Sequence, residues 1–378
     1  MITEQSKWTK SEGWGSTNPG SLGKETQLVI LFGSTENIRE MNQFDFIKEV
    51  YPNAFLWGGS TAGEIFQTQV TDDSLIMTAI KFEKTDLKSI CIEIESMKNS
   101  FEIGSHLGKN IDHNGLVHLF VLSDGLLING SELVAGITQN LPANVTVTGG
   151  LCGDGDKFNE TYVVCNGISK KGVVSALGLY GNNIKISYGS LGGWDPFGPE
   201  RLITKSDSNI LYEFDNKSAL ELYKKYLGDH AKELPASGLL FPLSIRLSES
   251  GEGVVRTILG IDEENQSMIF AGDVPEGSYA RLMKANFDRL IDGASGAAKA
   301  CESLTAREPD LAILISCVGR KMVLKQRIEE EVEAVKDVLG NKTALCGFYS
   351  YGEISPFNPS AKCEFHNQSM TITTISEL

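Results

Sequence analysis

The chain has 378 residues, of which 41% are hydrophobic and 22% charged, so it is long and apolar enough for two or three globular domains. Its formal net charge of -15 repels phosphate backbones and anionic lipid surfaces, which argues against nucleic-acid binding. No apolar run approaches the roughly 20 residues of a membrane helix, so we expect no membrane insertion. A polar start and seven irregularly spaced cysteines predict a cytoplasmic protein with no signal peptide and no disulfide framework.

Residues 1–26 are rich in Ser, Gly, Thr and Lys and lack periodicity, so we expect a loosely ordered N-terminal arm with one of its two tryptophans docked on the body. Order begins at residues 28–32, a continuous apolar run typical of a strand covered on both faces. A helix is expected at 41–50, and a second buried strand at 54–57 leads directly into a glycine-rich turn.

This order of elements returns twice. Strands are predicted at 117–122 and 145–148 around a helix at 131–139, and at 311–315 and 343–345 around a helix at 325–339. In all three copies the first strand ends roughly 25 to 30 residues before the turn, which is the range of a repeated supersecondary unit. We predict an α/β (α+β) fold of mixed sheets covered by helices, built from a recurring strand–helix–strand–glycine-turn unit.

A glycine- and proline-rich stretch at 189–199 divides the chain. We place a domain boundary near residue 200, because few contacts cross such linkers. The predicted organisation is an N-terminal arm at 1–26, one domain at 27–200 and a second domain at 201–378.

Each of the three glycine turns contains one carboxylate. A Gly-rich loop that leaves a buried strand exposes backbone N–H groups, which can hold a polar ligand. None of the turns fits the dinucleotide or phosphate-loop fingerprint, and a carboxylate attracts an ammonium, guanidinium or hydroxyl group rather than phosphate. The alternative interpretation is structural, since glycines let strands bend and the acid accepts backbone N–H bonds. The turns, at 58–64, 149–155 and 346–353, supply the candidate ligand-binding residues Gly59, Thr61, Glu64, Gly150, Asp154, Tyr351 and Glu353.

Cys317 and Arg320 follow the strand at 311–315, at the carboxyl end where ligand sites gather in open α/β sheets. Both are candidate ligand-binding residues: Cys317 as a thiol of lowered pKa, and Arg320 as a clamp for a carboxylate. The alternative is a small buried cysteine and a surface arginine. The sequence pairs no general base with Cys317, so we expect no enzyme and keep a cysteine-dependent enzyme as the alternative.

The five histidines offer few metal ligands. His118 lies in a predicted strand in phase with Phe120, so we assign it to the core. His366 and Cys363 have the spacing of a metal-binding pair, although a structural zinc site needs four ligands. We therefore name these two as metal-ligand candidates, for haem iron or, less favoured, for zinc.

The chain resembles the FIST N-terminal and FIST C-terminal domains over essentially its whole length from about residue 27. The resemblance rests on seven short motifs in a fixed order rather than on any single turn. These motifs lie at 58–64, 149–155, 241–243, 275–277, 316–320, 347–354 and 365–368.

The FIST resemblance implies a bacterial cytosolic sensory or ligand-binding module of signal transduction. A free-standing chain is most similar to the nitric-oxide-sensing subgroup, which implies haem binding and regulation of a partner histidine kinase or cyclic-di-GMP enzyme. The haem ligand of that subgroup maps onto no single histidine of this chain. Two alternatives without haem stay open, namely a sensor for a small amino-acid-like molecule and a protein-interaction scaffold.

Overall fold

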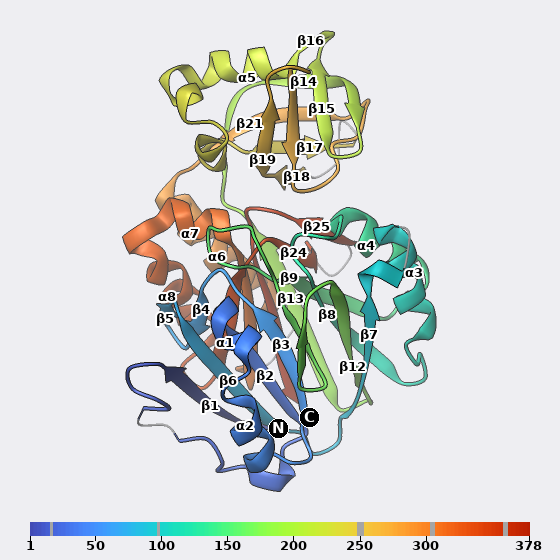
Figure 1. Cartoon of the computed structure of the whole chain (residues 1–378), viewed down its shortest axis with the longest axis vertical. Helices are drawn as coiled ribbons and strands as arrows, with labels where there is room; N and C mark the ends of the chain where they lie inside the picture. The colour runs from blue at the N-terminus through green and yellow to red at the C-terminus, as the bar shows by residue number, and fades with distance from the viewer. Residues whose placement is uncertain (16–17, 97–98, 248–252, 303–306, 358–361) are drawn as a thin grey trace.

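The computed structural model describes residues 1–15, 18–96, 99–247, 253–302, 307–357 and 362–378. Figure 1 shows a large body of sheets flanked by helices, with a smaller domain stacked on one end and both termini at the opposite end. The smaller domain is inserted into the body, because the chain enters it after residue 194 and returns to the body at residue 285. In the described part of the chain, no helix combines the length and apolar character needed to cross a membrane.

The body consists of three six-stranded sheets with one shared topology. In each, two central strands run parallel, and antiparallel strands flank them. The first sheet, in spatial order, is β1 (Ile2–Thr9), β6 (Ser74–Lys81), β2 (Leu28–Gly33), β3 (Phe55–Ser60), β10 (Val163–Cys165) and β11 (Ile168–Lys170). The second is β7 (Asp86–Glu93), β12 (Val173–Tyr180), β8 (Leu116–Ser123), β9 (Thr146–Leu151), β24 (Gly352–Pro356) and β25 (Cys363–His366). The third is β13 (Ile184–Leu191), β26 (Met370–Glu377), β22 (Leu311–Cys317), β23 (Ala344–Ser350), β4 (Glu64–Phe66) and β5 (Gln69–Thr71).

The three sheets are linked by an exchange of hairpins. The hairpin that follows each glycine motif does not pair with the strands of its own unit. It pairs instead with the central strand of a neighbouring unit and extends that unit's sheet. Hairpin β4–β5 pairs with β23, β10–β11 pairs with β3, and β24–β25 pairs with β9. The predicted repeat is therefore confirmed as three strand–helix–strand units, and each unit completes the sheet of a neighbour.

The continuous apolar strands are buried on both faces, as predicted. Along β2, Leu28, Ile30 and Phe32 face the core between the three sheets, where the ring of Phe32 lies 4.6 Å from that of Phe348. The alternate residues of β2 face a separate apolar cluster beneath helices. The covering helices are α1 (Thr35–Glu40) and α2 (Phe44–Val50) on the first sheet, α3 (Ser100–Asn110) and α4 (Gly130–Gln139) on the second, and α6 (Phe287–Glu302), α7 (Val318–Leu324) and α8 (Ile328–Leu339) on the third.

The inserted domain is an antiparallel sheet packed against one helix, with a core of its own. Its elements are β14 (Asp195–Asp207), β15 (Ile210–Phe214), β16 (Lys217–Ser218), α5 (Ala219–Leu227), η3 (Gly228–Glu233), η4 (Ala236–Leu240), β17 (Leu243–Arg246), β18 (Val254–Arg256), β19 (Ile258–Asp262), β20 (Ser267–Phe270) and β21 (Tyr279–Lys284). The boundary expected near residue 200 falls inside β14. Arg256 fixes this domain to the body by donating to the Phe365 carbonyl oxygen at 2.9 Å.

The N-terminal segment differs from the expected loose arm. Residues 2–9 form β1, which pairs with β6 along its whole length. Trp8 and Trp14 both pack against the apolar cluster beneath α1 and α2. The sequence of β1 shows little alternation because only Ser6 within it is buried, so pairing rather than amphipathicity holds this strand.

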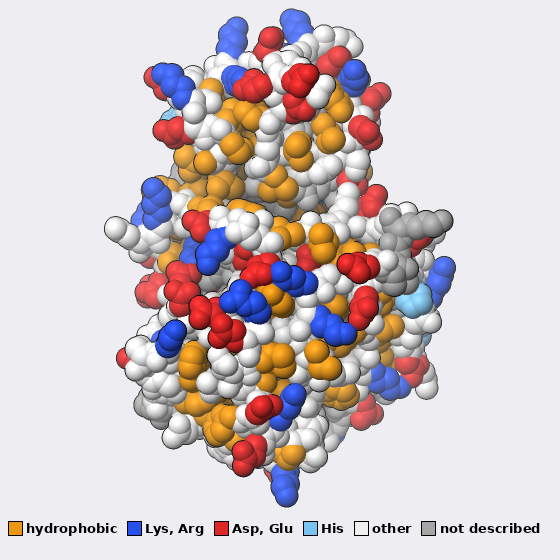
Figure 2. Space-filling view, in the orientation of Figure 1, with side chains coloured by type: hydrophobic (Ala, Val, Ile, Leu, Met, Phe, Trp, Pro, Cys, Tyr) orange, Lys and Arg blue, Asp and Glu red, His pale blue; other side chains and the backbone are white. Residues whose placement is uncertain are grey.

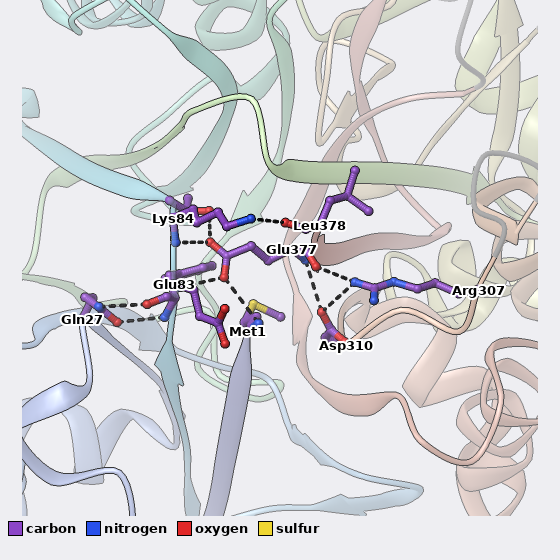
Figure 3. Close-up of polar contacts among 10 residues, drawn as sticks. Met1, Gln27, Glu83, Lys84, Arg307, Asp310, Glu377 and Leu378 are labelled. Atoms are coloured by element: carbon purple, nitrogen blue, oxygen red, sulfur yellow. Dashed lines mark hydrogen bonds and ion pairs between the residues drawn. The ribbon is translucent and has the colours of Figure 1, made fainter.

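At the end of the body opposite the inserted domain, the carboxylate of Glu377 connects three segments of the chain (Figure 3). Its oxygens accept hydrogen bonds from the backbone N–H groups of Glu83 and Lys84, each at 2.7 Å, and lie 3.3 Å from the amino group of Met1. This carboxylate therefore joins the last strand, the β6–β7 turn and the first strand. Cys91 of β7 and Cys165 of β10 form a disulfide, which the cysteine spacing did not predict.

Candidate functional site

A cavity of about 960 Å³ lies between the inserted domain and the body. The body contributes the loop after β8, the residues after β22 and Tyr351 after β23, whereas the inserted domain contributes η4, the start of β19 and the end of β20. One wall is thus formed at the carboxyl ends of β8 in the second sheet and β22 in the third sheet, each of which pairs with a parallel neighbour. Ligands bind at this edge in open α/β sheets. Figure 2 shows hydrophobic side chains gathered along this seam.

The lining of this cavity is largely apolar. Leu127 is 58% exposed, Leu259 49%, Phe158 41% and Leu126 38%, and all four belong to the lining. Large exposed apolar side chains that gather around one cavity are typical of a binding site rather than of ordinary surface. The apolar body of a small molecule would therefore be stabilised here.

Few polar groups in the lining are free to bind a ligand. The side-chain amides of Asn129 and Asn209 are already engaged with protein atoms. Thr257 is only 5% exposed, and its hydroxyl has no hydrogen-bond partner in the described part of the protein. A buried hydroxyl without a partner is costly, and a ligand atom or water would remove that cost.

Tyr351, a predicted site residue, lies in the wall of this cavity. Its hydroxyl donates to the carboxylate of Asp154, and its ring stacks on Phe158 with centroids 4.4 Å apart and planes 16° apart. Burial raises the pKa of the Tyr351 hydroxyl, so it stays protonated and remains a donor. Asp154 also accepts the backbone N–H groups of Phe158 and Asn159 at 2.8 and 2.7 Å, so these contacts fix the loop that separates this cavity from a second one.

Cys317 also lines the cavity, and its side chain is buried. Burial raises the pKa of the Cys317 thiol, and the nearby carboxylate of Glu353 raises it further. The opposing effect of the Arg320 guanidinium is smaller than both. Cys317 is therefore a neutral thiol in the cavity wall rather than an activated nucleophile.

Thr61, Glu64 and Asp154 line a second cavity of about 470 Å³. It shares Asp156, Val318 and Met322 with the larger cavity. The structure therefore brings together five of the predicted site residues, but it divides them between two adjoining cavities.

Glu64 and Glu353 have equivalent structural roles. Glu64 accepts hydrogen bonds from the Thr61 hydroxyl at 2.5 Å and from the Ser74 hydroxyl at 2.7 Å, and Glu353 accepts from the Ser350 and Ser369 hydroxyls at 2.8 Å each. Each carboxyl thereby ties its glycine turn to the start of the last strand of its unit. Burial raises the pKa of Glu64 to about 7 and that of Glu353 to about 8.

Arg320 clamps a carboxylate of the protein itself. The side chains of Arg320 and Glu331 are both fully buried, and Nη2 of Arg320 lies 2.7 Å from Oε2 of Glu331. Nη2 also donates to the Leu290 carbonyl oxygen at 2.8 Å. The predicted clamp thus exists, but its carboxylate comes from α8, and Arg320 lines neither cavity.

Two predicted glycines serve packing. A Cβ atom on Gly59 would lie 2.4 Å from the sulfur of Cys152, and one on Gly150 would lie 2.9 Å from the Cγ2 atom of Ile315. Neither glycine belongs to the lining of the two adjoining cavities.

The two metal-ligand candidates lie on β25 of the body, away from the two cavities described above. The Nε2 atom of His366 lies 2.7 Å from the Ser355 carbonyl oxygen, and burial lowers the pKa of His366 to about 4. Cys363 lines a third cavity of about 880 Å³, where its sulfur lies 3.3 Å from the Val147 carbonyl oxygen. In the described ranges, no group of three or more His, Cys, Asp and Glu side chains is arranged to hold a metal ion.

The sequence analysis missed the lining that comes from the inserted domain and from the β8 loop. Thr257 and Leu259 follow no motif, because they reach the cavity only through the packing of one domain on another. The loop at 125–129 did carry a signal, since it follows β8 as the lining residues Val318 and Gly319 follow β22 in the equivalent unit. Carboxyl ends of corresponding strands meet at the same edge of such a body.

Two family models together match most of this chain. The FIST N domain model matches residues 27–217, and the FIST C domain model matches residues 219–356. The uncharacterized protein MJ1623 of Methanocaldococcus jannaschii is 23% identical over 361 residues, which covers 88% of this chain and 67% of that protein. A crystal structure of chorismatase matches 99% of this chain and 98% of its own at 9% identity, with a TM-score of 0.36, which is too low to indicate a shared activity.

Proposed function

Because the chain belongs to the FIST family, whose domains are sensory and ligand-binding modules of signal transduction, we propose that it senses a small molecule in the cavity between the inserted domain and the body. The observation that carries this proposal is that both parts line one largely apolar cavity of about 960 Å³. That volume lies within the range of small-molecule sites.

A ligand in this cavity would couple the two parts of the protein. Leu259 lies on the inserted domain, and Leu126 and Met322 lie on the body, so an occupant touches both sides at once. A ligand shifts an equilibrium only by its difference in affinity for the two states. Contacts on both walls supply that difference, and the position of the inserted domain is the signal that a partner protein reads. We propose as the partner a signalling protein such as a histidine kinase or a cyclic-di-GMP enzyme.

Haem-based nitric oxide sensing is the more specific form of this proposal, and the residues present do not fit haem. None of the five histidines lines the cavity among the described residues, and His366 is bonded within the third unit. The lining offers Cys317, Met322 and Tyr351 as iron ligands, but the thiol is held neutral and the Tyr351 hydroxyl is bonded to Asp154. We therefore assign the cavity to a ligand other than haem.

The cavity assignment is tested with a matched pair of tryptophan substitutions. Ala236 and Ala135 are both exposed; Ala236 lines the proposed site, and Ala135 lines the separate 880 Å³ cavity, which the body and the inserted domain also form together. We expect the uncharged dye Nile red to bind the unmodified protein with increased fluorescence. Ala236→Trp should weaken that binding at least tenfold by filling the cavity, whereas Ala135→Trp should leave it unchanged.

The opposite pattern, with loss of binding in Ala135→Trp alone, would place the ligand in the other cavity. Hydrogen exchange adds the signalling readout. Bound dye should slow exchange in β19 and in α7 together, because they lie on opposite walls. Protection of one wall without the other would contradict coupling between the two parts.

A further inference from the structure

The two cavities that meet at the loop after Asp154 differ sharply in charge. The larger cavity has one charged side chain in its lining, Asp156. The smaller cavity is lined by six acidic side chains and two lysines, and Asp156 lies at the junction of both. The acidic residues are Glu36, Glu64, Asp72, Asp73, Asp154 and Asp156, and the lysines are Lys157 and Lys321.

Several of these carboxylates are already used by the protein. Asp72 pairs with Lys321, Glu64 holds the start of β6, and Asp154 accepts the loop N–H groups and the Tyr351 hydroxyl. In the described part of the chain, no hydrogen bond or ion pair involves the carboxylates of Glu36, Asp73 and Asp156. The carboxylates of Glu36, Asp73 and Asp156 therefore remain available where the small acidic cavity meets the larger apolar cavity.

A second observation, in the larger cavity, also indicates a ligand. Thr257 belongs to the lining and is more than nine-tenths buried, and its hydroxyl lacks a partner among the described residues. It is therefore a polar atom that a bound molecule would satisfy. Asp156 lies on the body side of the larger cavity, whereas the inserted domain contributes apolar residues such as Ile258 and Leu259 to its lining.

From this arrangement we infer that the ligand is an organic cation with an apolar body. The apolar part of the ligand lies in the larger cavity, and a hydrogen-bonding group of the ligand reaches Thr257. The ammonium group lies at Asp156, facing the smaller acidic cavity. The inference rests on the proposed function of the larger cavity and specifies the ligand class for it. A zwitterionic amino acid is disfavoured, because the same carboxylates that attract its ammonium group repel its carboxylate.

Three probes with the same eight-carbon chain test the charge preference: n-octylamine, n-octanol and n-octanoate. Each is titrated at pH 7 against protein loaded with Nile red. We expect octylamine to displace the dye at a concentration about three- to tenfold lower than octanol does, and octanoate to be the weakest. The advantage of octylamine should shrink when salt is raised from 20 to 300 mM, because the junction is open to solvent.

Asp156→Asn should remove most of the advantage of octylamine and leave octanol unchanged. Asp337→Asn is the matched control, since Asp337 is an exposed acid on α8 that lines neither cavity. If octylamine and octanol displace the dye equally, or if the two variants behave alike, the ligand is not a cation, although the cavity assignment stands. If none of the three probes displaces the dye, while Ala236→Trp also fails to weaken dye binding, the proposed function itself is wrong.

Discussion

Arg320 and Glu331 form a fully buried ion pair, in which Nη2 lies 2.7 Å and Nε 3.1 Å from the same carboxylate oxygen. The other oxygen of Glu331 accepts hydrogen bonds from the Ser316 hydroxyl at 3.1 Å and from the Tyr349 hydroxyl at 2.7 Å. The pair therefore fastens α7 and α8 to β22 and β23. Its position behind the cavity wall makes it a support of the site rather than a part of it.

Replacing Arg320 with Met should destabilise the protein by about 3 to 5 kcal/mol, because Glu331 is left as an uncompensated buried charge. Urea denaturation measures this loss. The double variant with Glu331→Leu should recover part of the stability, since it removes the stranded charge. An Arg320→Met protein of normal stability that no longer binds a ligand would instead make Arg320 a ligand clamp.

The raised pKa of Glu353 predicts how stability depends on pH. Its pKa rises from the ordinary value of 4.5 to about 8 through burial, so the folded state holds a proton that the unfolded state releases. This contribution to stability is full below about pH 4.5 and is lost as pH rises through about 8, by about 5 kcal/mol in total. Glu353→Gln should flatten the fall in unfolding free energy between pH 5 and 8, as measured by urea denaturation across that range.

Glu333→Gln is the control for that experiment, because Glu333 is exposed on α8. It should reproduce the pH profile of the unmodified protein. Identical profiles for both variants would show that Glu353 is ionised in the folded protein at neutral pH.

The first glycine of each turn is expected to be intolerant of any side chain. A Cβ atom on Gly58, Gly149 or Gly347 would lie 1.8 or 1.9 Å from a carbonyl oxygen of the neighbouring parallel strand. Gly347→Ala should therefore cost about 3 kcal/mol or more, because the two central strands must separate. Gly260→Ala, where the nearest atom is 3.7 Å away, should stay within about 1 kcal/mol in the same thermal and urea denaturation experiments.

Cys317 should react slowly with iodoacetamide in the folded protein at pH 8. The thiol is only 2% exposed, and its raised pKa leaves little thiolate. Intact-protein mass spectrometry with peptide mapping measures the modification. Ala236→Cys provides the comparison, because it introduces a thiol at an exposed position of the same cavity and should be alkylated readily. Faster labelling of Cys317 than of that introduced thiol would revive the cysteine-dependent enzyme.

Local sequence was sufficient to predict structural elements wherever the pattern of burial or the chemistry of a turn is contained within one segment. The runs at 28–32, 117–122 and 311–315 are strands of the body, each followed by helices and a second parallel strand. His118 is in the core, with its ring nitrogens 2.7 and 3.0 Å from the hydroxyls of Thr146 and Thr148. The repeated unit and the FIST family both follow from such local patterns.

Local sequence patterns did not indicate which strands or cysteines pair when they are far apart in the chain. Alternation shows which face of a strand is buried but not which strand it pairs with, so the pairing of β4 with β23 and of β24 with β9 gave no signal. Cys91 and Cys165 meet across 74 residues for the same reason. The strand β1 was missed because its order comes from backbone pairing with β6.

The sequence by itself determined the three glycine-rich motifs and the family, although the first glycines of these motifs lie within strands β3, β9 and β23 rather than in turns. Tertiary structure decided what the turns do: their first glycines admit a neighbouring carbonyl, Glu64 and Glu353 hold strands in place, and Arg320 serves Glu331. It also placed the candidate site beside the turns, because this cavity forms where the inserted domain packs on the body. Composition and spacing record the chemistry of each segment, but the distance between segments is set by how their surfaces pack.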